Sequence, residues 1–312
     1  MTVILYEYRI IKKKLNKKNN IVLIKKDKNI SQIKLKEPIY SWGEVKKFCT
    51  QDGHLFFVKD NMEIDGIYGI ASSKMYHDLG IATPQTFAVK SRRDIEDEIE
   101  IGSQDACSIP GIIVAKPKDV INDILIHFKN LKGKQNNTWD CLCNTELREL
   151  LLQAITPECL DQFVNILLLD TLRTDSDRHI ENYFFYKLPD SNKFEGIIPI
   201  DLEYGEIFNF CQFSKISFKE FLEVKYSTQT PSGQKDQAIP YSARMKKICD
   251  LIQIGKLNKQ QIALLKKCAA YDLPKLINST CDKYNLTSNK NDMYNIISKL
   301  WEYNNKNLEQ AL

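Results

Sequence analysis

Residues 174–185 read TDSDRHIENYFF, a charged stretch that turns abruptly apolar. Three acidic side chains, an arginine, a histidine and an asparagine occupy eight consecutive positions within it. The apolar periodicity predicts a helix before the stretch, over Cys159–Leu172, and a strand after it, over Tyr183–Lys187. The charged segment is therefore expected at the edge of a core, where a loop can hold polar side chains above a cleft. The alternative is a solvated surface loop with an ordinary ion pair.

The spacing within this loop suits phosphoryl transfer. Asp177 and Asn182 lie five positions apart. In such a reaction one carboxylate must meet the attacking hydroxyl, and a nearby side-chain oxygen must reach the metal on the phosphates. The catalytic loop of kinases provides an aspartate and an asparagine at this separation. The pattern also recurs by chance, so it needs support from the rest of the chain.

That support comes from a second apolar strand. Residues 197–200 read IIPI, and Asp201 follows them directly. Pairing of Tyr183–Lys187 with Ile197–Ile200 as a hairpin would bring Asn182 and Asp201 side by side. Carboxylate and amide oxygens suit Mg²⁺ or Mn²⁺, which binds few carboxylates together with phosphate oxygens. We therefore predict one small site that contains Asp177, Asn182 and Asp201.

The motifs DRHIEN, residues 177–182, and IIPIDLEYG, residues 197–205, resemble those of atypical kinases with a DRHxxN catalytic loop. These are the HipA-like, CotH-like and secretory-pathway kinases and the phosphoinositide kinases. The resemblance implies a two-lobed, protein-kinase-like α+β fold with a β-rich N-lobe and a mainly helical C-lobe. It also implies that Asp177 is the catalytic base and that Asn182 and Asp201 are the metal ligands.

The same resemblance gives the other charged side chains of the loop a function. Arg178 and His179 are expected either to brace the loop or to contact phosphate. Many members of these families have an asparagine two residues before the catalytic base, whereas this chain has Asp175 there.

In the N-terminal half, Lys59 ends the apolar run His54–Lys59. A lysine at the end of a buried strand requires an anion, and the α- and β-phosphates of ATP would supply it. The alternative is a lysine that extends to solvent from a sheet edge. The related kinases usually pair this lysine with a glutamate near the start of the following helix, here expected over Tyr68–Leu79. No acidic residue opens that helix, so we expect Glu63, or else Asp65, to pair with Lys59.

The sequence also predicts the position of three further segments. Ser41–Glu44 is expected to cover the phosphates, and Gly111–Pro117 to lie at the strand that leads to the hinge between the lobes. The lysines at positions 12–14, 17 and 18 lie between the β-rich stretches Thr2–Ile11 and Ile21–Ile24. They predict a solvated hairpin tip, the alternative being a polyanion site.

The chain changes character near residue 118. Short apolar runs separated by turn residues predict strands before this point, and helical periodicity dominates after it. We therefore expect an N-lobe over residues 1–118, which covers the nucleotide, and a C-lobe over residues 119–312. Helices are expected near 241–254, 258–269, 274–284 and 289–311, and a loop over Ser227–Gln237.

The composition excludes several classes of protein. Of the 312 residues, 43% are hydrophobic and 27% charged, which is typical of a globular protein. The formal charge of +4 does not indicate nucleic-acid binding. Nine cysteines without regular spacing favour reduced thiols over a zinc site. No apolar run predicts a transmembrane segment and no signal-peptide pattern is seen, which favours a cytoplasmic type of protein. The resemblance adds delivery into a host cell as a secreted effector.

The function expected from these observations is an ATP- and Mg²⁺- or Mn²⁺-dependent kinase that phosphorylates a protein hydroxyl, with serine or threonine favoured. A phosphoinositide or small-molecule kinase is the nearest alternative. A catalytically silent nucleotide-binding scaffold is the alternative from another class, and the missing helix glutamate favours it. The same absence suggests a small-molecule or protein activator beside the protein substrate.

Overall fold

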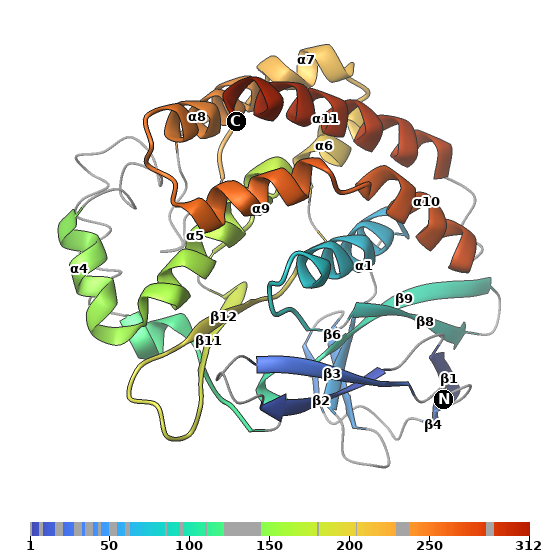
Figure 1. Ribbon diagram of the computed structural model, residues 1–312. Helices are drawn as coiled ribbons and strands as arrows, with labels where there is room; N and C mark the ends of the chain where they lie inside the picture. The colour runs from blue at the N-terminus through green and yellow to red at the C-terminus, as the bar shows by residue number, and fades with distance from the viewer. Residues whose placement is uncertain are drawn as a thin grey trace.

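The computed structural model, shown in Figure 1, consists of strand-rich and helix-rich parts. The structure describes residues 2–5, 9–15, 21–27, 33–34, 40–42, 45–49, 55–59, 63–84, 86–93, 96–109, 111–121, 145–179, 181–203, 205–228, 237–284 and 290–312. Most of the loop expected over 227–237 lies outside these residues. Among the described residues, no helix combines the length and the apolar character needed to cross a membrane.

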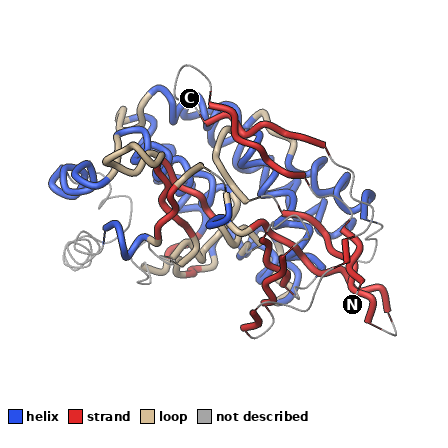
Figure 2. Tube along the Cα trace, turned by 90° about the horizontal axis from the view of Figure 1, so that it is seen from below, coloured by secondary structure: helices blue, strands red, loops and turns tan. Residues whose placement is uncertain are grey.

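The N-terminal part forms an antiparallel seven-stranded sheet in the order β4-β1-β8-β9-β7-β6-β5. Its strands are β1 (Thr2–Leu5), β4 (Ile33–Lys34), β5 (Tyr40–Trp42), β6 (Val45–Cys49), β7 (Leu55–Lys59), β8 (Thr86–Arg93) and β9 (Glu96–Gln104). The apolar run predicted as a strand over 54–59 is confirmed as β7. Figure 2 shows the strands in separate groups, with most helices behind them in that view.

A separate hairpin joins β2 (Arg9–Leu15) to β3 (Ile21–Asp27). The predicted hairpin is confirmed, but the position of its lysines is not. Lys12–Lys14 lie within β2 and pair with Val22–Ile24, rather than at the tip. The reason is that Leu15 continues the β pattern beyond the three lysines. Lys17 and Lys18 lie outside the described residues.

Helix α1 (Glu63–Asp78) connects β7 to β8 and begins five residues before the predicted start at Tyr68. Ile64 and Ile67 are only 3% and 2% exposed, so their burial outweighs the low helix propensity of the glycines beside them. The predicted end at Gly80 is confirmed by its φ of +88°, the left-handed conformation common after a helix.

The C-terminal part is mainly helical, as expected. It comprises α4 (Thr145–Ala154), α5 (Pro157–Leu172), α6 (Glu206–Phe208), α7 (Phe218–Glu223), α8 (Tyr241–Gln253), α9 (Lys259–Ala269), α10 (Leu273–Tyr284) and α11 (Lys290–Ala311). The four predicted helices of the tail are confirmed. One large apolar core unites these helices with α1, which lies between α10 and the sheet in Figure 1.

A second, three-stranded sheet has the order β10-β11-β12 and consists of β10 (Ile113–Ala115), β11 (Tyr183–Lys187) and β12 (Gly196–Pro199). The predicted β11–β12 hairpin is confirmed, with Tyr183 opposite Pro199. Gly111–Pro117 was expected at the strand that leads to the hinge between the lobes, and this expectation is wrong. The strand that leads out of the seven-stranded sheet is β9, whereas β10 pairs with β11. A small core around Ile198 and Tyr186, packed against Val114, holds β10 in this sheet.

The short strands β13 (Lys225–Tyr226) and β14 (Ile239–Pro240) pair at the far side of the helical part. The boundary between residues 118 and 119 stays a prediction. Strand β10 precedes that boundary, yet it pairs with a strand that follows it.

Candidate active site

The loop between α5 and β11 is fixed by its own backbone and by Asn182. The His179 N–H donates to the Asp177 carbonyl oxygen at 2.8 Å, and the Asn182 N–H donates to the His179 carbonyl oxygen at 2.9 Å. The Asn182 amide Nδ2 donates to the Asp177 carbonyl oxygen at 2.7 Å and to its carboxylate Oδ2 at 3.3 Å. These bonds orient the Asp177 carboxylate and leave Oδ1 of Asn182 as the oxygen available to a cation.

Arg178 lies below the loop and is only 2% exposed. Its Nε donates to Asp170 Oδ2 at 2.8 Å, and one terminal nitrogen donates to the carbonyl oxygens of Ile200, at 2.7 Å, and Asn182. The guanidinium therefore joins α5, the loop and the residue after β12. Of the two functions expected for Arg178, these contacts correspond to bracing.

His179 lies at the rim of the loop, with its side chain 21% exposed. Its Nε2 is 3.8 Å from Asp177 Oδ2, and its Nδ1 accepts the Glu181 N–H at 3.1 Å. The imidazole thus borders the Asp177 carboxylate and restrains the turn that follows.

Arg173, at the end of α5, is fully buried. Its terminal nitrogen donates to the Leu202 carbonyl oxygen at 2.6 Å, and its guanidinium lies 5.0 Å from the ring centre of Tyr68 and 5.2 Å from that of Tyr76. Tyr68 Oη donates to the Arg173 carbonyl oxygen at 2.7 Å, and Tyr76 Oη donates to Asp170 Oδ1 at 2.5 Å. Two tyrosines of α1 are thereby fixed to α5, the helix that precedes the loop of Asp177.

Asp175 lies between the two buried arginines. Its Oδ1 accepts the Asp177 N–H at 2.9 Å, and its Oδ2 is 3.3 Å from a terminal nitrogen of Arg178. Burial, together with the nearby charge of Asp170, raises the pKa of Asp175 to about 7, although Arg178 and Arg173 oppose this shift. The shift favours the protonated form of this buried side chain, which stands where many of the kinases that the motif resembles have asparagine.

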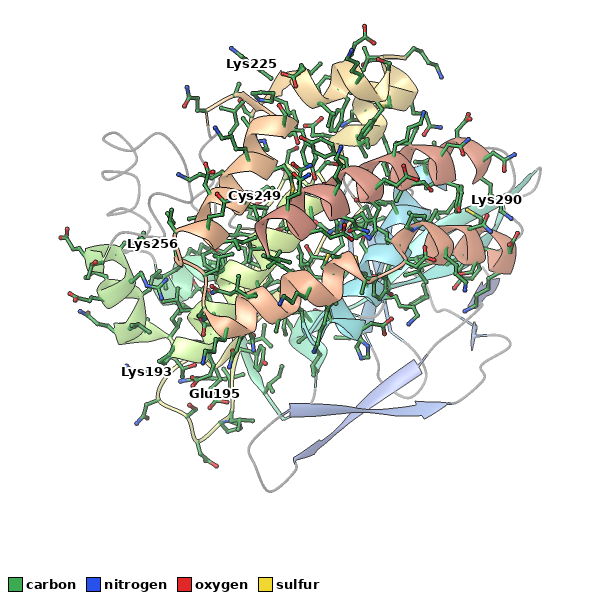
Figure 3. The ribbon with its side chains drawn as sticks, turned by 45° about the horizontal axis from the view of Figure 1, so that its top comes forward. Lys193, Glu195, Lys225, Cys249, Lys256 and Lys290 are labelled. Carbon is green, nitrogen blue, oxygen red and sulfur yellow. The ribbon has the colours of Figure 1, made fainter. Side chains whose placement is uncertain are left out.

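Asp201 follows β12 in the left-handed backbone conformation, with φ +53°. The register of the hairpin carries it to the site, because the Ile200 N–H donates to the Asn182 carbonyl oxygen at 3.0 Å. The turn of the hairpin lies at its opposite end, where Figure 3 labels Lys193 and Glu195. Left-handed conformations of residues other than glycine occur mostly at turns and functional sites.

Lys59, at the end of β7, meets this aspartate. Its ammonium forms an ion pair with Asp201 Oδ1 and lies 3.9 Å from Glu203 Oε1. Burial lowers the pKa of Lys59, but the carboxylates of Glu203, Asp201 and Asp177 outweigh burial and raise it above its ordinary value. The structure thus brings together four residues singled out in the sequence, Lys59, Asp177, Asn182 and Asp201.

The two partners expected for Lys59, Glu63 and Asp65, lie on α1, and the structure shows neither of them paired with it. Glu63 is the first residue of α1, and its side chain lies outside what the structure describes. Asp65 is described, and no ion pair joins it to Lys59; burial raises the pKa of this carboxyl group. Sequence reasoning missed Glu203, whose carboxylate lies near Lys59 in addition to that of Asp201.

The segment Ser41–Glu44, which is expected to cover the phosphates, is only partly described by the structure. Strands β5 and β6 form an antiparallel hairpin with Trp42 opposite Val45, and Val45 pairs in turn with Lys59. Trp42 and Val45 therefore lie at the end of the sheet that carries Lys59. Gly43 and Glu44 lie outside the described residues.

The donor set fits a divalent cation that also binds phosphate. The described residues hold no cluster of three or more histidine, cysteine, aspartate or glutamate side chains that could bind a metal alone. Asp201 and Oδ1 of Asn182 are the side-chain oxygens that could bind such a cation, because the Ile200 N–H to Asn182 carbonyl bond joins the two segments that carry them. Mg²⁺ is commonly held by one or two such ligands together with phosphate oxygens.

An antiparallel sheet that carries a strand lysine, joined to a helical part that carries the charged loop and hairpin, defines a two-lobed, protein-kinase-like fold. Among solved structures, the chain is similar to the Helicobacter pylori proinflammatory kinase CtkA. The two are 16% identical and align with a TM-score of 0.55 over 89% of this chain and 94% of that one. This likeness shows the α+β kinase fold.

A second match, WaaP in complex with acyl carrier protein, covers 88% of this chain and 89% of that one at 14% identity. Its TM-score of 0.29 is too low to support an argument. No family model and no curated protein sequence matches the chain.

Proposed function

We propose that the chain is an ATP- and divalent-metal-dependent kinase that transfers the γ-phosphate to a protein hydroxyl, with serine or threonine favoured. The observation that supports this most is the convergence of Lys59, Asp177, Asn182 and Asp201 on one site from three separate segments: the end of β7, the loop before β11 and the segment after β12. In this proposal the N-lobe, residues 1–118, covers the nucleotide, and the C-lobe, residues 119–312, carries the chemistry.

Each side chain has one function in this proposal. Lys59 binds the α- and β-phosphates, and Asn182 and Asp201 hold Mg²⁺ or Mn²⁺, which neutralises phosphate charge when bound. Asp177 accepts the proton of the substrate hydroxyl as its oxygen bonds to the γ-phosphorus. The bond from that phosphorus to the β-phosphate oxygen breaks, and ADP leaves.

Transfer of labelled phosphate tests the proposal. The purified chain is incubated with γ-labelled ATP and Mg²⁺ or Mn²⁺ and with casein, inositol-lipid vesicles or amino alcohols as acceptors. We expect label on casein, and a loss of about 10²–10⁴-fold in rate for Asp177→Ala with ATP binding retained. Asp190→Ala, in the exposed hairpin turn, is the matched control. Wild-type turnover in a folded Asp177→Ala variant would overturn the assignment of the base. Label on lipid or amino alcohol alone would overturn the protein acceptor.

The motif resemblance suggests that the protein is an effector delivered into a host cell. A second arm of the same assay therefore adds extract of eukaryotic cells, as a source of a protein or small-molecule activator and of protein substrates. Binding of ATP and metal with no transfer in either arm would instead support the silent scaffold.

A further inference from the structure

We propose that Glu203 is the positioning partner of Lys59, in place of the helix glutamate used by other kinases. This inference rests on the proposed function and concerns the same site. Glu203 Oε1 lies 3.9 Å from Lys59 Nζ, and the Glu203 side chain is 13% exposed. It comes from the segment after β12.

The packing of α1 explains why the carboxylate comes from this segment. Gly69 is in the middle of α1, where glycine costs about 1 kcal/mol relative to alanine. A Cβ at Gly69 would lie 2.7 Å from Cγ and 3.3 Å from Cα of Glu203. The helix surface at this point is therefore occupied by Glu203, and the glycine leaves the space that the glutamate fills.

The need for Glu203 follows from the two functions of Asp201. In the structure Asp201 pairs with Lys59, but the proposed function requires the same carboxylate to hold a metal ion. Asp201 cannot satisfy both cations fully, whereas Glu203 can hold the lysine while Asp201 turns to the metal. In this arrangement Glu203 holds the ammonium of Lys59, and Asp201, two residues earlier, holds the metal ion.

The anchoring of α1 gives this arrangement a consequence for regulation. Tyr68 and Tyr76 fix α1 to Arg173 and Asp170 of the helical part. A lysine partner on α1 would have depended on the position of that helix. A partner on the segment after β12 instead makes the Lys59–Glu203 pair depend on how the sheet closes over the helical part.

Kinetics of matched variants test the proposal. Glu203→Gln keeps the shape of the side chain and removes its charge. We expect the KM for ATP to rise and kcat/KM to fall by about 10²-fold, the loss typical of a misplaced phosphate-binding group. Glu203→Asp should retain part of the activity, and Asp190→Asn should match the wild type. A Glu203→Gln variant with wild-type kcat and KM would overturn the inference while leaving the proposed function intact.

Relocation of the carboxylate separates positioning from mere packing. Glu203→Ala should be impaired, and the added substitution Gly69→Glu should restore more of kcat/KM than Gly69→Gln, because both refill the space beside residue 203 and only the first returns a carboxylate. If Glu203 only filled space, the two added substitutions would restore kcat/KM equally.

A stability cycle makes the test independent of transfer. Urea midpoints are measured without nucleotide for the wild type, Lys59→Met, Glu203→Gln and the double variant. We expect the double variant to lose less than the sum of the two single losses, because the second substitution removes a pair already broken. Additive losses would overturn the pairing even if no acceptor were phosphorylated. An inactive wild type with non-additive midpoints would overturn the proposed function alone.

Discussion

Arg178 is buried, and every nitrogen of its guanidinium has an acceptor in the structure. Three of these acceptors are carboxylate oxygens of Asp170 and Asp175 on α5 and the loop, and two are carbonyl oxygens of the hairpin segments. The side chain therefore joins α5, the loop and the residue after β12 into one fixed arrangement.

Arg178→Met should lower the free energy of unfolding by about 3–5 kcal/mol, because it leaves buried carboxylates and carbonyl groups without their donor. Urea denaturation measures the loss, and Lys256→Met, at an exposed position, serves as the control. A loss below about 1 kcal/mol would show that water or Arg173 replaces the guanidinium.

Asp175 predicts a dependence of stability on pH. Its pKa is raised from 3.8 to about 7 in the folded protein, mainly by burial. A raised pKa contributes stability that is fully present below the unfolded pKa and is lost as the pH rises through the folded one. Between about pH 4 and 7 the wild type should therefore lose stability relative to Asp175→Asn, by at most about 1.4 kcal/mol per pH unit.

Urea midpoints at pH 5, 6, 7 and 8 check this expectation, and Asp190→Asn should run parallel to the wild type. A constant difference between the wild type and Asp175→Asn across this range would mean that Asp175 stays ionised, held by the two arginines.

At the scale of elements, α1 behaves as part of the helical half. Its apolar side chains share the large core, and Tyr271 Oη of the tail donates to Asp78 Oδ2 at 2.9 Å. The hydrogen bond from Tyr76 to Asp170 is buried. It connects α1 with the carboxylate that also accepts hydrogen bonds from Arg178.

Tyr76→Phe should cost about 1.5–3 kcal/mol of stability, since it deletes one hydrogen bond to a charged group and keeps the ring. The measurement is the urea midpoint, with Tyr294→Phe at an exposed site of α11 as the control. Equal midpoints for the two variants would indicate that Asp170 is fully satisfied by Arg178 and that the hydroxyl contributes nothing.

The elements themselves were largely predictable from the sequence. Helical periodicity gave the four tail helices, and an apolar run on each side of a polar turn gave the β11–β12 hairpin. The start of α1 was not predictable, because Gly66 and Gly69 are poor helix formers and only tertiary burial of Ile64 and Ile67 outweighs them. The pairing of β10 likewise depends on contacts with residues some 70 positions later, which local patterns do not contain.

The residues of the candidate site were likewise only partly predictable from the sequence. Asp177, Asn182 and Asp201 could be placed together, because a short loop and a hairpin register connect them. Lys59 required the family resemblance, since it comes from the other half of the chain. Glu203 was missed because its closeness to Lys59 follows from the packing of α1. The sequence signals for it were a glutamate two residues after Asp201 and a glycine inside a helix.

At the scale of the whole molecule, binding of ATP with Mg²⁺ should stabilise the folded state by mass action. We expect the melting temperature of the wild type to rise with ATP and Mg²⁺, and the rise to shrink in Asp201→Ala. Without ligand, Asp201→Ala should melt close to the wild type, because its ion pair with Lys59 is partly exposed and such pairs contribute about 0–1 kcal/mol.

Thermal denaturation with and without ATP and Mg²⁺ or Mn²⁺ checks this, and higher metal concentrations should restore part of the shift. If Asp201→Ala kept the full shift but melted several degrees lower without ligand, Asp201 would be a structural residue at the end of β12 and would not hold the metal.

The tyrosines that fasten α1 also bear on the choice of chemical inhibitors. Compounds that act on a kinase by wedging this helix outward need a space behind it that opens at low cost. Here that space is filled by the rings of Tyr68 and Tyr76 and the guanidinium of Arg173, all fully buried. For the proposed kinase, a screen is therefore better directed at competitors for ATP than at compounds that displace the helix.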